Sequence, residues 1–165
     1  MNRTLLLAAI VFAGVVTGAQ ATAIASDAQP KDFPAQAYAG TIHRPDFKGA
    51  NHAYATYRTH IREGVAGGPN FAGHLALITF GCGTGCNTTL VADLASGKLG
   101  EFPLGGEDYL YLNLVYDKTS RLVAANWMKD NRCLQEKLVW DGAVFSASPA
   151  KDIGDQAVCD KLSGL

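Results

Sequence analysis

The hydrophobic and polar positions divide the chain into three parts. Residues 5–16 form an uninterrupted apolar run, LLLAAIVFAGVV. Residues 26–50 show little periodicity and contain three prolines, which disfavour a long helix, so we expect an irregular N-terminal arm there. Periodic segments fill residues 51–165, a length that suits a single globular domain.

The first periodic segment of this domain predicts a helix over residues 51–63. Asn51 can cap its N-terminus, and Gly64 follows as a residue type that commonly ends helices. Three side chains would share one face of this helix: Tyr54, Tyr57 and Ile61. The same residues also fit a strand. At the far end of the chain, residues 152–162 predict a short terminal helix.

Between these helices the pattern becomes that of β-strands. We predict strands over residues 74–80, 88–94, 99–102, 109–116, 121–127, 133–140 and 143–146. In one of them the side chains alternate, with Leu110, Leu112 and Leu114 on one side and Tyr109 and Tyr111 on the other. Asp141-Gly142 is typical of a two-residue hairpin turn. An antiparallel meander of six or seven strands, with one N-terminal helix and a short C-terminal helix, is an α+β, mainly β fold. We expect it to curl into a half-barrel around the first helix.

The apolar run at the N-terminus has the features of a cleavable signal peptide. Arg3 precedes it, and small residues follow with two A-x-A sites, which predict cleavage after Ala21 or Ala25. The alternative is a membrane anchor, but a spanning helix needs about 20 apolar residues, and this run has 12. We therefore predict that residues 1–25 are a signal peptide. The mature protein would be periplasmic or secreted, with no stable membrane anchor after cleavage.

Charge excludes two classes of partner. Loss of Arg3 with the signal peptide leaves a net charge of −2, and no block rich in lysine and arginine remains. Neither nucleic acid nor an anionic membrane surface would be attracted by such a chain. Phosphate-binding and dinucleotide motifs are absent from the sequence, and we expect no cofactor.

Four cysteines in an exported chain indicate two disulfides, for which three pairings exist. We favour Cys82–Cys86 and Cys133–Cys159. The first pair lies in the sequence GCGTGC, whose glycines permit the closure of a small ring. The second would tie the C-terminal segment to the sheet and would contribute more to stability, because it closes a longer loop.

Two glycine-rich motifs flank the strand over residues 74–80. The run 68–74 (GPNFAGH) and the run 81–86 (GCGTGC) together resemble a group of small exported bacterial proteins of uncharacterised function. The sequence DLASGK at 93–98 and Ser-Arg-Leu at 120–122 fit the same resemblance, which covers roughly residues 55–145. It implies a secreted single domain and no particular activity.

His74 has three interpretations. Its surrounding order, GHLALI, is similar to the histidine strand of papain-like amidases that cleave cell-wall peptides, and Cys133 would then be the nucleophile. Against this, the segment around Cys133 has the pattern of a strand, and the even cysteine count favours a disulfide there. His74 could instead belong to a binding loop, or be a hydrogen-bonded structural residue, which we favour.

Cys82 and Cys86 also have an alternative interpretation as a copper or redox site. Exported copper-delivery proteins use a C-x-x-x-C pair, but on a thioredoxin-like fold that this meander does not resemble. A pairing of Cys82 with His74 is geometrically weak, because the intervening strand would separate them by about 20 Å.

The sequence therefore predicts a disulfide-stabilised, non-enzymatic binding module of the cell envelope, of which an inhibitor or immunity-type protein is one version. Its partner would be a protein or a small ligand. The candidate binding residues are Asn70, His74, Gly83, Thr84 and Gly85. The alternatives are a cysteine amidase that uses Cys133 and His74, and a copper or redox protein that uses Cys82 and Cys86.

Overall fold

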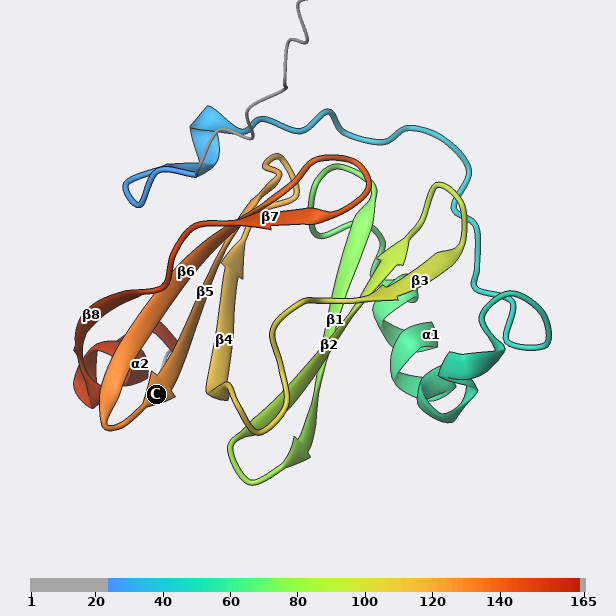
Figure 1. Ribbon diagram of the computed structural model, residues 1–165. Coiled ribbons are helices and arrows are strands. Elements are labelled where there is room, and N and C mark those ends of the chain that lie inside the picture. Colours follow the sequence, from blue (N-terminus) through green and yellow to red (C-terminus); the bar gives the residue numbers. More distant parts are fainter. Residues whose placement is uncertain (1–23, 164–165) are drawn as a thin grey trace, which may run out of the picture.

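The computed structural model of the chain describes residues 24–163. Residues 1–23 of the predicted signal peptide, with the cleavage site after Ala21, lie outside the described residues, as do residues 164–165. The described part contains two antiparallel sheets and two α-helices (Figure 1). This arrangement confirms the predicted α+β, mainly β fold.

The first sheet has the strand order β1-β2-β3. The second has the order β4-β5-β6-β7, and β8 pairs with the same strand, β6. The strands are β1 (Leu75–Gly83), β2 (Cys86–Asp93), β3 (Lys98–Glu101), β4 (Leu110–Tyr116), β5 (Leu122–Lys129), β6 (Arg132–Trp140), β7 (Phe145–Ala147) and β8 (Lys151–Asp155). From β4 to β7, each strand pairs antiparallel with the next strand in the chain, which is the arrangement of the predicted meander.

Residues 75–78 of β1 are buried on both faces of the first sheet, which explains why this half of the strand is an uninterrupted apolar run. Side chains of one face join the helix α1 (Arg58–Ala66) in a separate core cluster: Ala76, Ile78, Leu90 and Ala92 pack with Ile61 and Val65. Side chains of the other face point to the second sheet: Leu75, Leu77 and Val91. Successive residues of a strand point to opposite faces, so a strand covered on both sides has no polar positions to alternate.

The largest core cluster lies between the two sheets. The second sheet contributes Leu112, Val123, Ala125, Trp127 and Leu138. Phe71 and Phe102 fill the space from the loops before β1 and after β3. Full burial of an apolar side chain of this size stabilises the fold by about 1.5–3 kcal/mol. Because α1 covers the opposite face of the first sheet, the strands do not form the expected half-barrel around this helix.

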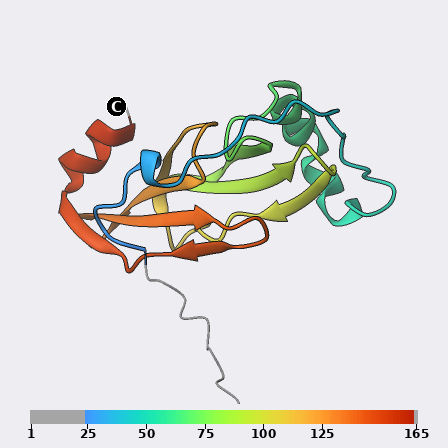
Figure 2. The same cartoon turned by 90° about the horizontal axis from the view of Figure 1, so that it is seen from above.

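The N-terminal arm runs across both sheets on one side of the molecule (Figures 1 and 2). At the second sheet, the Lys137 ammonium of β6 donates to the carbonyl of Ala28 at 2.6 Å. At the first sheet, the His43 N–H donates to the carbonyl of Leu94 at 2.9 Å. A small third core cluster forms where the arm covers the outer face of the second sheet, with Ala28 against Leu122 and Val139. The arm is irregular, as predicted, yet it is packed as part of the fold.

One short segment, Asn70–His74, joins the arm to both sheets, and we call it the 70–74 hub. The N–H of Ala72 and the N–H of Gly73 donate to the turn between β4 and β5, at 3.1 and 2.7 Å. The carbonyl of Gly73 accepts from the arm residue Tyr38 at 3.2 Å, and the carbonyl of His74 accepts from Leu94 at 3.0 Å. The hub backbone therefore holds three parts of the chain that are far apart in sequence.

The first predicted helix is present with different limits. A 3₁₀ segment (His52–Tyr57) precedes α1, which continues past Gly64. We expected the side chain of Asn51 to cap this helix, but it makes no capping hydrogen bond. Its amide donates to the carbonyl of Gly97 at 2.9 Å and accepts from the N–H of Leu99 at 3.0 Å. The long-range pairing with β3 replaces the local capping role.

The alternation predicted for β4 is interrupted at its start. Tyr111 has a φ of 55°, and the pairing with β5 shifts register between Leu110 and Asn113. Leu112 and Leu114 face the core as predicted. Leu110, which was expected on the same side, is 39% exposed. A bulge of this kind re-aims the side chains that precede it.

Two C-terminal elements also differ from the prediction. The expected two-residue turn at Asp141-Gly142 is a four-residue loop, since Trp140 pairs with Phe145. The Asp141 carboxylate closes this loop by accepting from two of its N–H groups. The terminal helix α2 (Gln156–Ser163) begins later than expected, because the residues before it form β8 and pair with β6.

The arm contact at Gly73 can be tested against a glycine of the same backbone conformation. Gly73 has a φ of 78°, and a Cβ there would collide with the carbonyl oxygen of the arm residue Gln36. Gly68 has a φ of 76°, and a Cβ there would meet nothing within 4 Å. The left-handed backbone costs alanine about 1–2 kcal/mol at either position.

We therefore expect Gly73→Ala to lower the free energy of unfolding by at least about 1 kcal/mol more than Gly68→Ala, because overpacking adds its own cost. Urea denaturation of both variants measures the difference. Equal losses would contradict the close approach of the arm to the hub.

Candidate functional site

Asn70 uses its side-chain amide to complete the first sheet. The amide oxygen accepts from the N–H of Leu77 at 2.8 Å, and the amide nitrogen donates to the carbonyl of the same residue at 3.0 Å. The side chain thus satisfies one residue of β1 as a neighbouring strand would. Both polar groups of this candidate binding residue are engaged in backbone pairing.

His74 is half-buried beside the hub. Its Nδ1 lies 3.1 Å from the carbonyl oxygen of Ala72. A carbonyl can only accept, so this nitrogen carries a proton. Its Nε2 lies 3.9 Å from a carboxylate oxygen of Asp93. These contacts are those of the structural role that we favoured from the sequence.

The other three candidate residues lie at the opposite end of β1. Gly83, Thr84 and Gly85 form the tip of the β1–β2 hairpin, which the Cys82–Cys86 disulfide closes. The hub and this tip are separated by the length of a nine-residue strand, about 26 Å at 3.3 Å per residue. The structure therefore does not bring Asn70 and His74 together with the tip.

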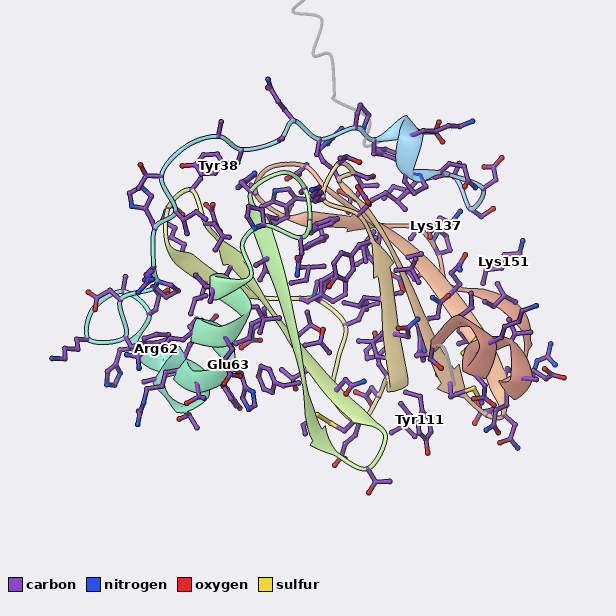
Figure 3. The ribbon with its side chains drawn as sticks, turned by 180° about the vertical axis from the view of Figure 1, so that it is seen from behind. Tyr38, Arg62, Glu63, Tyr111, Lys137 and Lys151 are labelled. Atoms are coloured by element: carbon purple, nitrogen blue, oxygen red, sulfur yellow. A yellow bond between two sulfur atoms is a disulfide. The ribbon has the colours of Figure 1, made fainter. Side chains whose placement is uncertain are left out.

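Tyr111 lies against the disulfide-closed tip, and the sequence did not single it out (Figure 3). Its N–H donates to the carbonyl of Gly85 at 2.7 Å. A Cβ on Gly85 would lie 3.1 Å from the Tyr111 ring, so the glycine leaves room for the aromatic side chain. The neighbouring Asn87 amide donates to the carbonyl of Leu112 at 3.0 Å and joins the hairpin to β4 a second time.

The backbone of Tyr111 is strained, and more than half of the residue is exposed to solvent. A φ of 55° is unusual for a non-glycine residue, and a strained conformation of this kind often marks a functional position. The residue is nevertheless 55% exposed, among the highest values for a large apolar or aromatic residue in the described chain. Only knowledge of the bulge, which the sequence does not encode in a recognisable motif, would have identified it.

An open cleft of about 850 Å³ begins beside Tyr111 and lies over the second sheet, at the start of β4 and the turn between β5 and β6. Its lining includes the aromatic pair Tyr109 and Trp127, whose ring centroids lie 5.1 Å apart in an edge-to-face arrangement. The charged residues of the lining are Glu107, Asp108, Lys129 and Asp130. Tyr111 lines this cleft and also contacts Gly85 of the tip, and the charged residues of the cleft carry a net negative charge.

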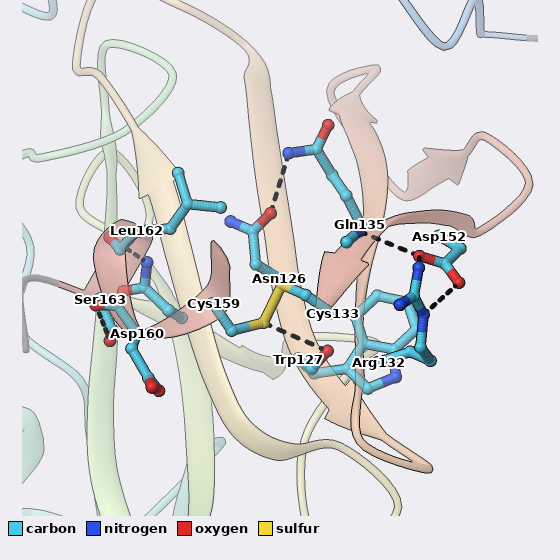
Figure 4. The surroundings of a disulfide bond; sticks show 12 residues. Asn126, Trp127, Arg132, Cys133, Gln135, Asp152, Cys159, Asp160, Leu162 and Ser163 are labelled. Atoms are coloured by element: carbon cyan, nitrogen blue, oxygen red, sulfur yellow. Dashed lines mark hydrogen bonds and ion pairs between the residues drawn. A yellow bond between two sulfur atoms is a disulfide. The ribbon is translucent and has the colours of Figure 1, made fainter. Parts of the chain in front are cut away.

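The second disulfide joins Cys133 of β6 to Cys159 of α2, as predicted (Figure 4). The first disulfide joins Cys82 to Cys86, which was also predicted. Both sulfur-bearing residues of the second bridge are buried. Nearby, the Arg132 guanidinium makes two hydrogen bonds to the Asp152 carboxylate, at 2.8 and 2.9 Å. Arg132 thereby lowers the pKa of Asp152 below its ordinary value.

These bonds bear on the two alternative functions. An amidase needs a thiolate nucleophile, but the sulfur of Cys133 is bonded to that of Cys159. Cys133 also lies in β6 of the second sheet, whereas His74 precedes β1 of the first sheet. A copper site of this kind needs two thiolates, but the sulfurs of Cys82 and Cys86 are bonded to each other as a disulfide. Among residues 24–163, no group of three or more His, Cys, Asp or Glu side chains is placed to hold a metal ion.

Comparisons with protein-family models, with curated proteins and with solved structures gave no significant match. Within residues 24–163, no helix is long and apolar enough to cross a membrane.

The two disulfides should contribute unequally to stability. The bridge between Cys133 and Cys159 closes a separation of 26 residues, and that between Cys82 and Cys86 a separation of 4. From loop-closure entropy we expect the Cys133→Ser/Cys159→Ser variant to lose about 3.5 kcal/mol of unfolding free energy and the Cys82→Ser/Cys86→Ser variant about 2 kcal/mol. Urea denaturation measures both, and the reverse order would contradict the assignment of the first bridge as a local brace.

Proposed function

We propose that the protein is an exported, non-enzymatic binding module of the cell envelope, and that it binds a protein partner through the hairpin tip and Tyr111. An inhibitor or immunity-type protein directed at a cell-wall-degrading enzyme is the concrete version. The resemblance of its glycine-rich motifs to small exported bacterial proteins is part of the same proposal. The two disulfides are compatible with an oxidising compartment.

The single observation that carries this proposal is the exposed, strained Tyr111 against a disulfide-braced loop. Binding surfaces concentrate their affinity in a few aromatic anchors. An anchor that is already fixed loses less conformational entropy on association. Here the bulge fixes the backbone of Tyr111, and the disulfide fixes the loop against which its ring lies.

The adjoining cleft supports a partner with basic side chains. Three carboxylates and one ammonium line it, so its field favours a positively charged surface. The partly buried ring of Tyr109, which packs edge-to-face on the buried Trp127, offers apolar contact beside those charges. A protein surface that presents arginine or lysine next to apolar groups matches both features.

Affinity capture from envelope extract tests this proposal, with the exported protein as bait. Its intact mass should lack residues 1–21 or 1–25, and full-length protein recovered from the cytoplasm of its native host would refute export.

Tyr111→Gly removes the ring and also relieves the left-handed strain, which costs about 1–2 kcal/mol. We expect it to lower affinity for the captured protein about 30-fold, as loss of a hot-spot residue does.

The control is Val144→Ala, which truncates a residue that is 59% exposed in the loop between β6 and β7. It should leave capture unchanged. The Cys82→Ser/Cys86→Ser variant should weaken binding and the Cys133→Ser/Cys159→Ser variant, measured under folding conditions, should not. Undiminished capture by Tyr111→Gly would refute the proposed surface.

A further inference from the structure

The outer edge of β1 is only partly covered by the described chain. At its start, the Leu75 N–H donates to the carbonyl of Phe71 at 2.9 Å, and the Leu75 carbonyl accepts from the N–H groups of Asn70 and Phe71. The Asn70 side chain then pairs with both backbone groups of Leu77. Two residues of the edge are therefore satisfied by the hub, and one of them is satisfied by a side chain in place of a strand.

The next two residues of the same alternation are Thr79 and Gly81. In an antiparallel strand, every second residue directs its N–H and C=O to the same side. Their partners on β2 agree with this direction: Thr89, opposite Thr79, accepts from Phe102 on its far side at 3.0 Å. Across residues 24–163, no backbone group pairs with Thr79 or Gly81 at this edge. Both residues are exposed.

A groove of about 400 Å³ lies at the start of this uncovered edge, where Leu77, Ile78 and Thr79 of β1 line it. One wall is α1, with His60, Glu63 and Gly64, and the other is Tyr116 of β4. Gly64 allows α1 to lie close to the strand, because a Cβ there would be 2.6 Å from a side-chain carbon of Ile78. Burial raises the pKa of the Tyr116 hydroxyl above its ordinary value. Figure 3 shows Glu63 on the part of α1 nearest to β1.

We propose that this edge binds an extended peptide segment of the partner protein as an added β-strand. This inference rests on the proposed binding function and specifies how the partner is recognised. Unpaired N–H and C=O groups repeated at every second residue match the backbone of another strand, and they give affinity without regard to side chains. The pairing of Asn70 with Leu77 is the same interaction, made within the chain one step earlier on the edge.

The walls of the groove define the side chains that the segment would carry. Alternate residues of an added strand would face Tyr116 and α1. The α1 side presents the carboxylate of Glu63, and no lysine or arginine is part of the lining. We therefore expect a basic residue at the positions that face α1 and an apolar residue at those that face Tyr116. The segment would continue to the disulfide-closed tip, where Gly83 and Tyr111 lie.

A second copy of this chain fits the edge less well than a free segment does. The edge lies between two flanking elements, α1 and β4. Pairing of two β1 strands would bring a second α1 and a second β4 against the first pair. A single extended chain carries no such flanking elements.

The test uses linear ten-residue peptides selected by phage display against the purified exported protein, with the best binder synthesised. Its binding should slow hydrogen–deuterium exchange at the amides of Thr79 and Gly81 by at least about tenfold. The amides of Ile78 and Phe80, which face β2, should not change. An N-methyl scan of the peptide should show losses of about tenfold at every second residue.

A proline at the edge provides the matching protein variant. Thr79→Pro removes the N–H and places a ring in the groove, so it should abolish peptide binding. Glu101→Pro introduces the same residue on the opposite edge of the same sheet and should leave binding unchanged. If Thr79→Pro does not fold, the period of two in the N-methyl scan decides.

Four results would overturn strand addition. Protection confined to the tip and Tyr111, with Thr79 unchanged, would refute it and leave the binding function standing. Failure to select any peptide, together with Tyr111-dependent capture of a partner, would do the same. Concentration-dependent protection of Thr79 in the free protein would identify a second copy as the occupant. If the wild-type protein captures no partner and binds no peptide, the proposed function is refuted as well.

Discussion

The backbone pairing of the 70–74 hub is the constraint on which the rest of the structure depends. It fixes the start of β1 through Leu75, holds the turn between β4 and β5, and receives the N-terminal arm at Gly73. Phe71, fully buried, extends from the same segment into the core between the sheets. The loop of five residues thus joins two sheets that share no strand pair among the described residues, together with the core between them and the hydrogen bonds of Tyr111 and Asn87 at the far end.

This placement separates structural and functional roles along a single strand. At one end of β1, the amide group of Asn70 and the Nδ1 of His74 are engaged within the fold. Toward the other end, the outward backbone groups of Thr79 and Gly81 have no backbone partner within residues 24–163. There a disulfide closes the hairpin tip, which is hydrogen-bonded to Tyr111. A rigid strand anchored in the hub presents the free end in a fixed geometry, which is the condition for tight binding by a small domain.

Much of the fold could be predicted because its signals are local. The apolar run of β1 and the glycine loops marked strands and turns, and cysteine spacing led to both disulfides. The errors came from long-range pairing: Asn51 binds β3 instead of capping α1, and residues before α2 join β6. Tyr111 and the free edge at Thr79 could not be predicted, because a bulge and an uncovered strand edge depend on which segments meet in space.

The central claim is that the hub sustains the fold while the far end of β1 binds the partner. Asn70→Ala tests it in one variant, measured for unfolding free energy and for affinity of the folded protein toward the captured partner. Loss of the pairing with Leu77 should cost about 1–3 kcal/mol of stability and leave affinity within a few-fold of the wild type. Unchanged stability with lost binding would contradict this division and would place the binding site in the GPNFAGH motif.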